Sequence, residues 1–276
     1  MTGIRLGLIG DNIAASRSPD LHRIAGQLCG LDVSYELLVP RETGMDFETL
    51  FQSCADGSRR GVNVTYPYKE VAAGMVRIDD IQTREIGAVN TVLFEDAGPA
   101  GHNTDYSGFI AAWRETFGAV TPGEVALIGA GGVGRAIAFA LATLGAAEIR
   151  ITDQDMAKAD RLAAAVPDAV ACADVSTAAQ NADGIINCTP LGMTGNPGSA
   201  IPAEVLGGQL WAFDAVYTPL ETQFRADAIA AGLDFMSGYE LYFHQGVQAF
   251  HIFSGMEPPD LARLRQLLET DNVTAT

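Results

Sequence analysis

A short apolar strand that runs directly into a glycine loop constrains this chain more than any other feature. Glu124–Gly129 is an apolar run, and a helical pattern continues from the loop to about Leu144. This order is typical of a dinucleotide-binding fold, in which loop N–H groups and the helix N-terminus receive a pyrophosphate. A plain turn with glycines for packing is the alternative. The spacing G-x-G-x-x-G predicts that the cofactor is bound by Gly129, Ala130, Gly131, Gly132, Val133 and Gly134.

An acidic residue at the end of the next strand bears on the choice of cofactor. The run Glu148–Thr152 reads as a strand, and Asp153 follows it about twenty residues after the loop. A carboxylate there can accept hydrogen bonds from the adenosine ribose hydroxyls. It would also repel a 2′-phosphate, and no cation follows before Lys158. We therefore predict NAD as cofactor, with NADP second. Capping of the next helix is an alternative role for Asp153.

The rest of the chain alternates short apolar runs with helical patterns. After the glycine loop the apolar runs Gly184–Asn187 and Leu210–Asp214 continue the series, which indicates a parallel sheet covered on both faces. Before residue 104 the pattern of apolar runs and helical segments is different. Ala88–Phe94 is expected there as a strand, followed by a turn over Glu95–Gly101. Helices are expected from Gly238 onward, with a break at Pro258-Pro259. The fold class is therefore α/β.

The charge balance excludes some classes of partner. The 276 residues carry 17 basic and 34 acidic side chains, a net charge of −17. So acidic a surface repels phosphate backbones and anionic lipid, so we expect neither nucleic-acid nor membrane binding. The nearly uncharged run Val125–Ala147 contains Arg135 and clustered glycines, and is better explained by a buried strand, loop and helix than by a membrane span.

Cysteine and histidine usage point to a cytoplasmic protein without a metal centre. Four cysteines lie far apart with no C-x-x-C pair, which indicates reduced, buried thiols. The N-terminal apolar run is too short for a signal peptide. The four histidines lack ligand spacing, so no metal site is expected, and we expect them at the surface or beside the site: His22, His102, His244 and His251.

Two serines stand at an expected helix start. Ser16 and Ser18 precede Pro19, which suits the first position of a helix. The helix N-terminus would favour a substrate carboxylate beside these hydroxyls. Ser18 could equally serve only as the N-cap of that helix.

Three further polar clusters need an explanation. The segment Asn63–Lys69 carries an alternating polar face and ends in a lysine after a proline. Taken alone, Lys69 would be a solvated surface charge, Asn103–Asp105 a helix cap and Asn90 a turn residue.

In combination, these clusters resemble the shikimate/quinate dehydrogenases. The resemblance runs from Gly10 to about Gly255, and the motifs occur in the order found in that family. Eight ordered elements at compatible spacing are more specific than any one of them. The elements are Ser16–Pro19, Asn63–Lys69, Gly87–Thr91, Asn103–Asp105, Gly129–Gly132, Ile186–Met193, Asp214–Pro219 and Gln245.

The resemblance implies a two-domain protein and a role for each motif. It implies a substrate-binding catalytic domain over residues 1–104 and 239–276, to which the C-terminal helices return, and a Rossmann-type domain over 105–238. Monomer and homodimer both remain open. The implied roles are Lys69 and Asp105 as the catalytic pair; Ser16, Ser18 and Tyr217 on the substrate carboxylate; Thr65, Asn90, Asp105 and Gln245 on the ring hydroxyls; Asn63 as a supporting substrate-binding residue; and Thr189 and Gly238 as further cofactor contacts.

The chain also departs from the family pattern. Glu240 and Tyr242 stand where relatives commonly have glycine and a smaller residue near the nicotinamide, which puts those contacts and the substrate preference in doubt. Asp153 replaces the basic patch of NADP-dependent members. Ser18 favours shikimate over quinate, since quinate-preferring relatives often carry threonine there.

The expected reaction is hydride transfer between a ring CH–OH group and the nicotinamide. A lysine can take the hydroxyl proton or stabilise the alkoxide, and the sequence leaves both roles open for Lys69. Two alternatives are a non-catalytic metabolite-binding regulator on the same fold and another two-domain dehydrogenase with a catalytic lysine.

Overall fold

Two sheets organise the chain, one in each of two units. The computed structural model describes residues 3–274. Unit 1 contains the chain up to Thr104 and again from Phe243 onward, and unit 2 contains Asp105–Tyr242. The predicted division places the second boundary at Tyr239. The unit boundary lies four residues later because helix α11 (Gly238–Ser254) continues through this region without interruption.

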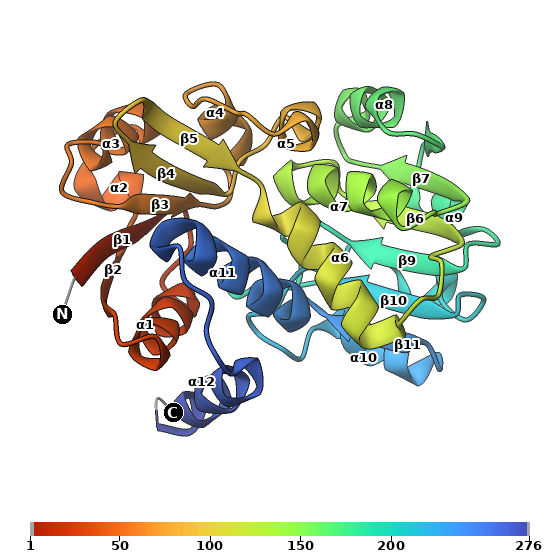
Figure 1. Ribbon diagram of the computed structural model, residues 1–276. Coiled ribbons are helices and arrows are strands. Elements are labelled where there is room, and N and C mark those ends of the chain that lie inside the picture. The colour runs from red at the N-terminus through yellow and green to blue at the C-terminus, as the bar shows by residue number, and fades with distance from the viewer. Residues whose placement is uncertain (1–2, 275–276) are drawn as a thin grey trace. The chain divides into compact units, whose positions relative to one another are not determined.

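Unit 1 is a five-stranded mixed sheet with helices on both faces (Figure 1). The strand order is β2-β1-β3-β4-β5. Strands β1, β2 and β3 are parallel to one another, and β4 pairs antiparallel with both of its neighbours, β3 and β5. The strands are β1 (Gly3–Ile9), β2 (Asp32–Leu38), β3 (Gly61–Val64), β4 (Thr91–Glu95) and β5 (Gly98–His102). The helices are α1 (Ser18–Leu28), α2 (Pro40–Thr43), α3 (Phe47–Cys54), α4 (Lys69–Ala73), α5 (Ile81–Ile86), α12 (Leu261–Thr274) and the part of α11 from Phe243.

The two faces of this sheet differ in chemistry because successive side chains of a strand point to opposite sides. Val62 and Val64 of β3 pack with Phe51 of α3 in an apolar cluster. Asn63, between the two valines, points to the other face, where rings from α1 and α11 lie. One face is therefore an ordinary apolar core, whereas the other carries polar side chains.

The turn expected over Glu95–Gly101 is confined to residues 96–97, and the rest of that segment after β4 is a strand. Residues Gly98–His102 form β5, which pairs antiparallel with β4. The prediction was wrong because Gly-Pro-Ala-Gly-His has no β-branched or aromatic residue, so its pairing depends on the neighbouring strand rather than on local propensity. Pro99 is tolerated because β5 is the edge of the sheet.

His22 lies in the core of unit 1 and not at the surface; of the two expected places it occupies the one beside the candidate site, where it contacts Tyr35 and Asn63. The ring is 1% exposed and stacks on Tyr35 with centroids 4.9 Å apart. Phe250 and Phe253 of α11 pack on it at 6.2 and 5.7 Å. Burial lowers the pKa of His22 to about 3, although a hydrogen bond with the Asn63 side chain opposes this shift. The ring is therefore neutral in the folded protein.

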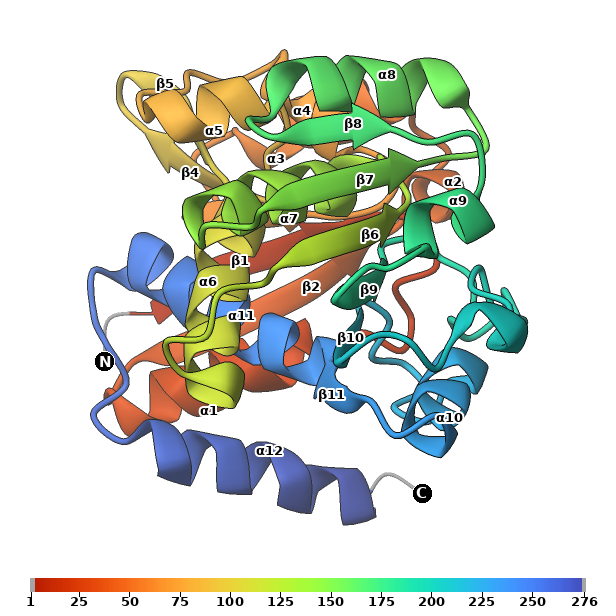
Figure 2. The same ribbon diagram turned by 90° about the vertical axis from the view of Figure 1, so that its right-hand side faces the viewer.

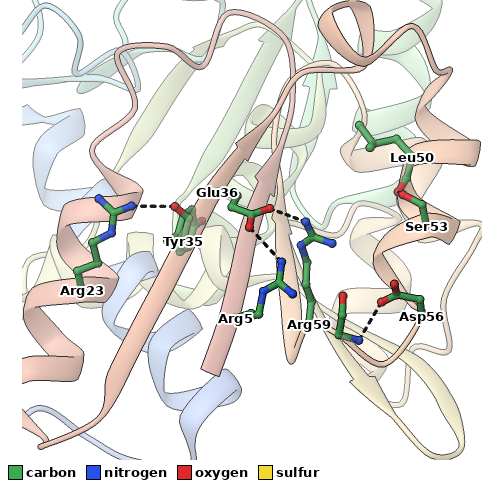
Figure 3. Close-up of polar contacts among 9 residues, drawn as sticks. Arg5, Arg23, Tyr35, Glu36, Leu50, Ser53, Asp56 and Arg59 are labelled. Atoms are coloured by element: carbon green, nitrogen blue, oxygen red, sulfur yellow. Dashed lines mark hydrogen bonds and ion pairs between the residues drawn. The ribbon is translucent and has the colours of Figure 1, made fainter. Parts of the chain in front are cut away.

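Charged side chains lie along the β2 edge of this sheet. Figure 3 shows Glu36 between Arg5 and Arg59, with N–O distances of 3.2 and 2.5 Å. The hydrogen bond from Arg59 holds the pKa of Glu36 below its usual value. Arg23 of α1 donates to the Tyr35 carbonyl at 3.0 Å, which ties α1 to β2.

Unit 2 is a six-stranded parallel sheet in the order β11-β10-β9-β6-β7-β8 (Figure 2). The strands are β6 (Glu124–Ile128), β7 (Glu148–Thr152), β8 (Ala169–Ala171), β9 (Gly184–Asn187), β10 (Trp211–Asp214) and β11 (Asp234–Ser237). The helices are α6 (Thr104–Phe117), α7 (Gly132–Thr143), α8 (Met156–Ala165), α9 (Val175–Ala179), α10 (Gln223–Ala230), the 3-10 turn Ala203–Val205 and the start of α11. This is the Rossmann-type arrangement that the β-α-β series predicts.

Both faces of the second sheet are apolar, as expected for parallel strands covered by helices. Phe213 of β10 points to one face and packs edge-on against Phe109 of α6 at 5.1 Å. Its neighbour Ala212 points to the other face, into a cluster with Ala178 of α9 and Phe224 of α10. This two-sided burial explains why the strands of this unit read as continuous apolar runs.

Two expectations from composition can be compared with the structure. No helix within residues 3–274 has both the length and the hydropathy needed to cross a membrane. No disulfide joins the four cysteines, all of which lie within the described residues, but only Cys54 is buried, and Cys29, Cys172 and Cys188 are partly exposed. The expectation that all four thiols are buried was therefore wrong.

We predict that His22 makes unit 1 sensitive to acid. His22 binds a proton near pH 6.5 in the unfolded chain and only near pH 3 in the folded chain. Its contribution to the free energy of unfolding is therefore fully present above pH 6.5 and is lost as the pH falls from there toward 3. For each unit by which the pH is lowered, the free energy of unfolding should fall by up to about 1 kcal/mol less in the His22→Phe variant than in the wild type. Denaturant unfolding between pH 5.5 and about 7.5 measures both slopes.

Candidate active site

The ends of β1 and β3 position the predicted lysine. Thr65 follows β3, and its N–H donates to the Ile9 carbonyl at 2.9 Å. A short turn then leads to Lys69, the first residue of α4, which is only 8% exposed. The Lys69 carbonyl accepts a hydrogen bond from Val89 N–H at 2.9 Å, which ties the lysine to the segment containing Asn90. A lysine is rarely this buried without a function or a partner.

Asn90 is the centre of a buried polar cluster in unit 1. Thr104 N–H donates to Asn90 Oδ1 at 2.8 Å. Asn90 Nδ2 donates to Thr104 Oγ1 at 2.9 Å and lies 3.4 Å from Gln245 Oε1. Unit 1 therefore brings together two of the predicted hydroxyl-binding residues, one beside β4 and one on α11.

The two serines contact each other at the start of α1. Ser16 Oγ donates to Ser18 Oγ at 3.2 Å and accepts from Ser18 N–H at 3.3 Å. The expectation that Ser18 is the N-cap was wrong, since Ser18 lies inside the helix and Arg17 precedes it without a side-chain cap. Pro19 is near the first helical position, as expected. Both hydroxyls are partly exposed.

The glycine loop of unit 2 has the geometry of an anion site. Gly129 has φ +104°, which favours glycine, and a Cβ on Gly134 would lie 1.9 Å from the Gly129 carbonyl oxygen. A Cβ on Gly131 would instead meet no atom within 4 Å. Within the described residues no side chain caps α7 at Gly131, so the capping position does not occupy the first N–H groups of the helix. These residues therefore fit a dinucleotide pyrophosphate.

Asp153 lies at the end of β7 beside this loop. Its Oδ2 accepts from Ala130 N–H at 2.7 Å and its Oδ1 from Asp155 N–H at 2.9 Å. The alternative that Asp153 caps the next helix was wrong, because Asp155 caps α8 by accepting from Ala157 N–H. Each carboxylate oxygen retains acceptor capacity for a ribose hydroxyl.

A second buried network orders the loops after β9 and β10. Asn187 Oδ1 accepts from the Thr189 hydroxyl at 2.7 Å, and Asn187 Nδ2 donates to Asp214 Oδ1 at 2.9 Å. Asp214 also accepts from Thr222 Oγ1 at 2.6 Å. Burial raises the pKa of Asp214, and its three hydrogen bonds, from Thr222, Val216 N–H and Asn187, oppose the shift. The sequence motifs contained Asn187 and Asp214 but gave no sign that they pair.

Aromatic stacking fixes Tyr217 within unit 2. Its ring stacks on Tyr242 with centroids 4.8 Å apart and planes 17° apart, and Tyr239 lies 5.6 Å from Tyr242. The large ring of Tyr242, a departure from the family pattern, therefore holds the ring of Tyr217, which is a predicted substrate-binding residue. Gly238 begins the helix, where a Cβ would lie 2.6 Å from the Asp214 carbonyl oxygen.

Other residues of these clusters are positioned by partners that sequence reasoning missed. Asp105 is buried in the first turn of α6, directly after Thr104, whose N–H is held by Asn90. Tyr35 and Thr91 bond to Asn63 at 2.8 and 3.0 Å. Tyr35 lies on β2, far in sequence from any of the motifs, so nothing near it in the sequence indicates its contact with Asn63. Only the register of the strands in the sheet shows this contact.

Comparison with known families gives two matches along the chain. Residues 8–92 match the shikimate dehydrogenase substrate-binding domain. Residues 124–208, which contain the glycine loop and Asp153, match a family described as NADP oxidoreductase, coenzyme F420-dependent. The first match covers the serines, Lys69 and Asn90.

Relatives match over nearly the whole length. A quinate/shikimate dehydrogenase (NAD⁺) of Corynebacterium efficiens is 37% identical, with 95% of this chain and 96% of the relative covered. The structure of quinate dehydrogenase from Corynebacterium glutamicum in complex with NAD has a TM-score of 0.87 at 34% identity, covering 98% and 100% of the two chains. Shikimate 5-dehydrogenase from Thermus thermophilus, in complex with NADP(H) and shikimate, has a TM-score of 0.83 at 32% identity, covering 97% and 99%. The resemblance of the motifs is thereby confirmed, and this chain belongs to the shikimate/quinate dehydrogenase family.

Proposed function

We propose that this protein interconverts shikimate and 3-dehydroshikimate, with NAD as the redox partner. One observation carries the proposal. A buried lysine is tied to the segment of Asn90, whose amide faces Gln245. A cyclic polyol needs such an arrangement of donors and acceptors, with a group beside it that handles one hydroxyl proton. Membership of the family supports the same reaction.

The substrate contacts follow from the polar clusters. Ser16 and Ser18 would hold the carboxylate, with Tyr217 as a further donor. Thr65, Asn90, Asp105 and Gln245 would hold the ring hydroxyls. Asn63 supports this set from its own strand rather than from the substrate side.

Proton transfer would fall to Lys69 and Asp105. In the oxidative direction the lysine amine accepts the proton of the reacting hydroxyl, or its ammonium stabilises the alkoxide as the C–H bond breaks. Asp105 would orient both the lysine and that hydroxyl. The nicotinamide, when bound, supplies the hydride acceptor. Both side chains are buried, which strengthens their electrostatic action.

The residues around the glycine loop would hold NAD. N–H groups from Gly131 to Gly134 would face the pyrophosphate, with Gly129, Ala130 and Val133 shaping the turn. Asp153 would bond the ribose hydroxyls and disfavour the 2′-phosphate of NADP. Thr189 and Gly238 would complete the cofactor contacts. We place NADP second.

Quinate is the second candidate substrate. The Corynebacterium relatives carry quinate in their names, and one neighbouring structure is a quinate dehydrogenase with NAD. Ser18 still favours shikimate, because it lacks the methyl group of the threonine expected beside quinate. We also propose that the protein acts in the cytoplasm, as a monomer or homodimer. The lack of a disulfide among its four cysteines supports the cytoplasmic location.

An assay of shikimate and quinate, each with NAD and NADP, tests the proposed function. The change in nicotinamide absorbance measures the rate in each combination. We expect the highest kcat/KM for shikimate with NAD. A preference for NADP would contradict the role of Asp153. Absence of turnover in all four combinations would contradict the proposed reaction.

Replacing the buried lysine should slow the chemical step. Lys69→Ala should lower kcat about 10²-fold or more, the usual scale for an acid–base group. Lys158, the only other lysine of the chain, is exposed on α8, and Lys158→Ala is the matched control. A kcat within about twofold of wild type in Lys69→Ala would remove this residue from the mechanism.

Two glycine variants separate folding from cofactor binding. Gly134→Ala places a methyl group against the Gly129 carbonyl, so we expect a stability loss of about 2 kcal/mol or more. Gly131→Ala enters open space at a φ of −78°, so the melting temperature should stay unchanged while NAD affinity falls. Thermal melting and NAD titration measure both. Unchanged NAD affinity in Gly131→Ala would place the pyrophosphate elsewhere.

A further inference from the structure

Three side chains form a row across the sheet of unit 1, on the face that α1 and α11 cover. Tyr35 of β2 is in register with Leu6 of β1, and Asn63 of β3 with Leu8, so both point to the same side. Thr91 of β4 is directly opposite Asn63. The Tyr35 hydroxyl reaches over β1 to Asn63 Oδ1 at 2.8 Å. This row joins three strands, β2, β3 and β4, through buried side chains and passes over β1.

Backbone groups fix the direction of every hydrogen bond in the row. Asn63 Nδ2 lies 3.1 Å from the Asn90 carbonyl, which can only accept, so this atom is the donor and Oδ1 must accept from Tyr35. Asn90 Oδ1 accepts from the Thr104 N–H, which orients the second amide in the same way. The Thr91 hydroxyl accepts from Asn63 and donates to Asn90 Oδ1 at 3.1 Å.

These contacts use the full capacity of the Asn63 amide. Its two N–H groups bond the Asn90 carbonyl and the Thr91 hydroxyl. Its oxygen accepts from Tyr35 and also takes part in a hydrogen bond with the ring of His22. An amide oxygen accepts two such bonds. Asn63 therefore has no donor or acceptor left for a substrate.

We propose that Tyr35 is a positioning residue for the substrate contact of Asn90, and that it acts through Asn63. This rests on the proposed function, which assigns a ring hydroxyl to Asn90. The Tyr35 hydroxyl locks the plane of the Asn63 amide, and that amide holds both the Asn90 carbonyl and the Thr91 hydroxyl. Asn90 is thereby held at its main chain and at its side chain.

The long contact beyond Asn90 shows what this positioning serves. Asn90 Nδ2 and Gln245 Oε1 are 3.4 Å apart, beyond the usual range for an N–H···O bond. A hydroxyl both accepts and donates, so one inserted here would accept from Asn90 and donate to Gln245. A small displacement of the Asn90 side chain would break this bracket, whereas the main-chain hydrogen bond from Val89 N–H to the Lys69 carbonyl would remain.

Tyr35→Phe removes the hydroxyl and little else. The ring can still stack on His22, and Arg23 still donates to the backbone carbonyl (Figure 3). We expect KM for shikimate to rise about fivefold, the effect of one neutral hydrogen bond, while kcat and the KM for NAD stay near wild type. A merely structural role would not confine the effect to one KM. An unchanged KM for shikimate would overturn the proposal.

A double-mutant cycle tests whether Tyr35 acts through Asn90. KM for shikimate is measured for Tyr35→Phe, Asn90→Ala and the double variant. If Asn90 carries the effect, the double variant should match Asn90→Ala. Independent, multiplicative effects would overturn the proposal. If Asn90→Ala does not fold, Gln245→Ala, at the other side of the bracket, replaces it in the same cycle.

Phe51→Leu controls for general destabilisation. Phe51 is 2% exposed in the apolar cluster on the opposite face of the same sheet. This variant should lower the melting temperature without raising KM for shikimate, and an equal rise would overturn the positioning role. The wild-type rate tests the proposed function separately. No wild-type turnover contradicts that function, whereas normal wild-type turnover with an unchanged KM in Tyr35→Phe contradicts only the positioning role.

Discussion

A polar group buried beneath α1 and α11 is costly without a hydrogen-bond partner, and this cost orders the candidate site in unit 1. Asn63 stands between Val62 and Val64 on β3, where an apolar residue would pack with less demand on its surroundings. An unsatisfied amide there would cost about 1–3 kcal/mol. The structure satisfies it from both neighbouring sides, with Tyr35 and Thr91. The side chains of Asn63 and Thr91 also bond Asn90, so the hydrogen bonds that satisfy the buried amide of Asn63 also determine the position of Asn90.

Local sequence predicted the features that depend on local chemistry. The glycine loop, Asp153 and the helix break at Pro258-Pro259 each lie within a few residues of the structure they specify. Strand β5 and the partners of Asn63 could not be predicted in this way. They depend on register between segments far apart in the chain, and one such contact joins residues 35 and 63. The sequence could not decide between the surface and a place beside the site for His22, because a lone histidine gives no sign of stacking on Tyr35.

The acidic composition sets a further constraint on an enzyme for anionic ligands. The chain has two lysines, and one of them is buried at the candidate site. Groups without net charge would add to this attraction, namely the N–H groups of α7 and the serine hydroxyls at α1. Such dipoles act over short distances. The protein can therefore remain strongly negative overall and still receive a carboxylate and a pyrophosphate.

The edges of both sheets bear on how the protein resists self-association. An open strand edge can pair with another chain, and long apolar edges promote aggregation. In unit 1 one edge carries Glu36 with its arginines, and the other carries Pro99, which lacks an N–H group. In unit 2 the edge strands β8 and β11 have only three and four residues. Near pH 4.4, where the net charge vanishes and charge repulsion no longer keeps molecules apart, these edges would be the remaining protection against strand pairing.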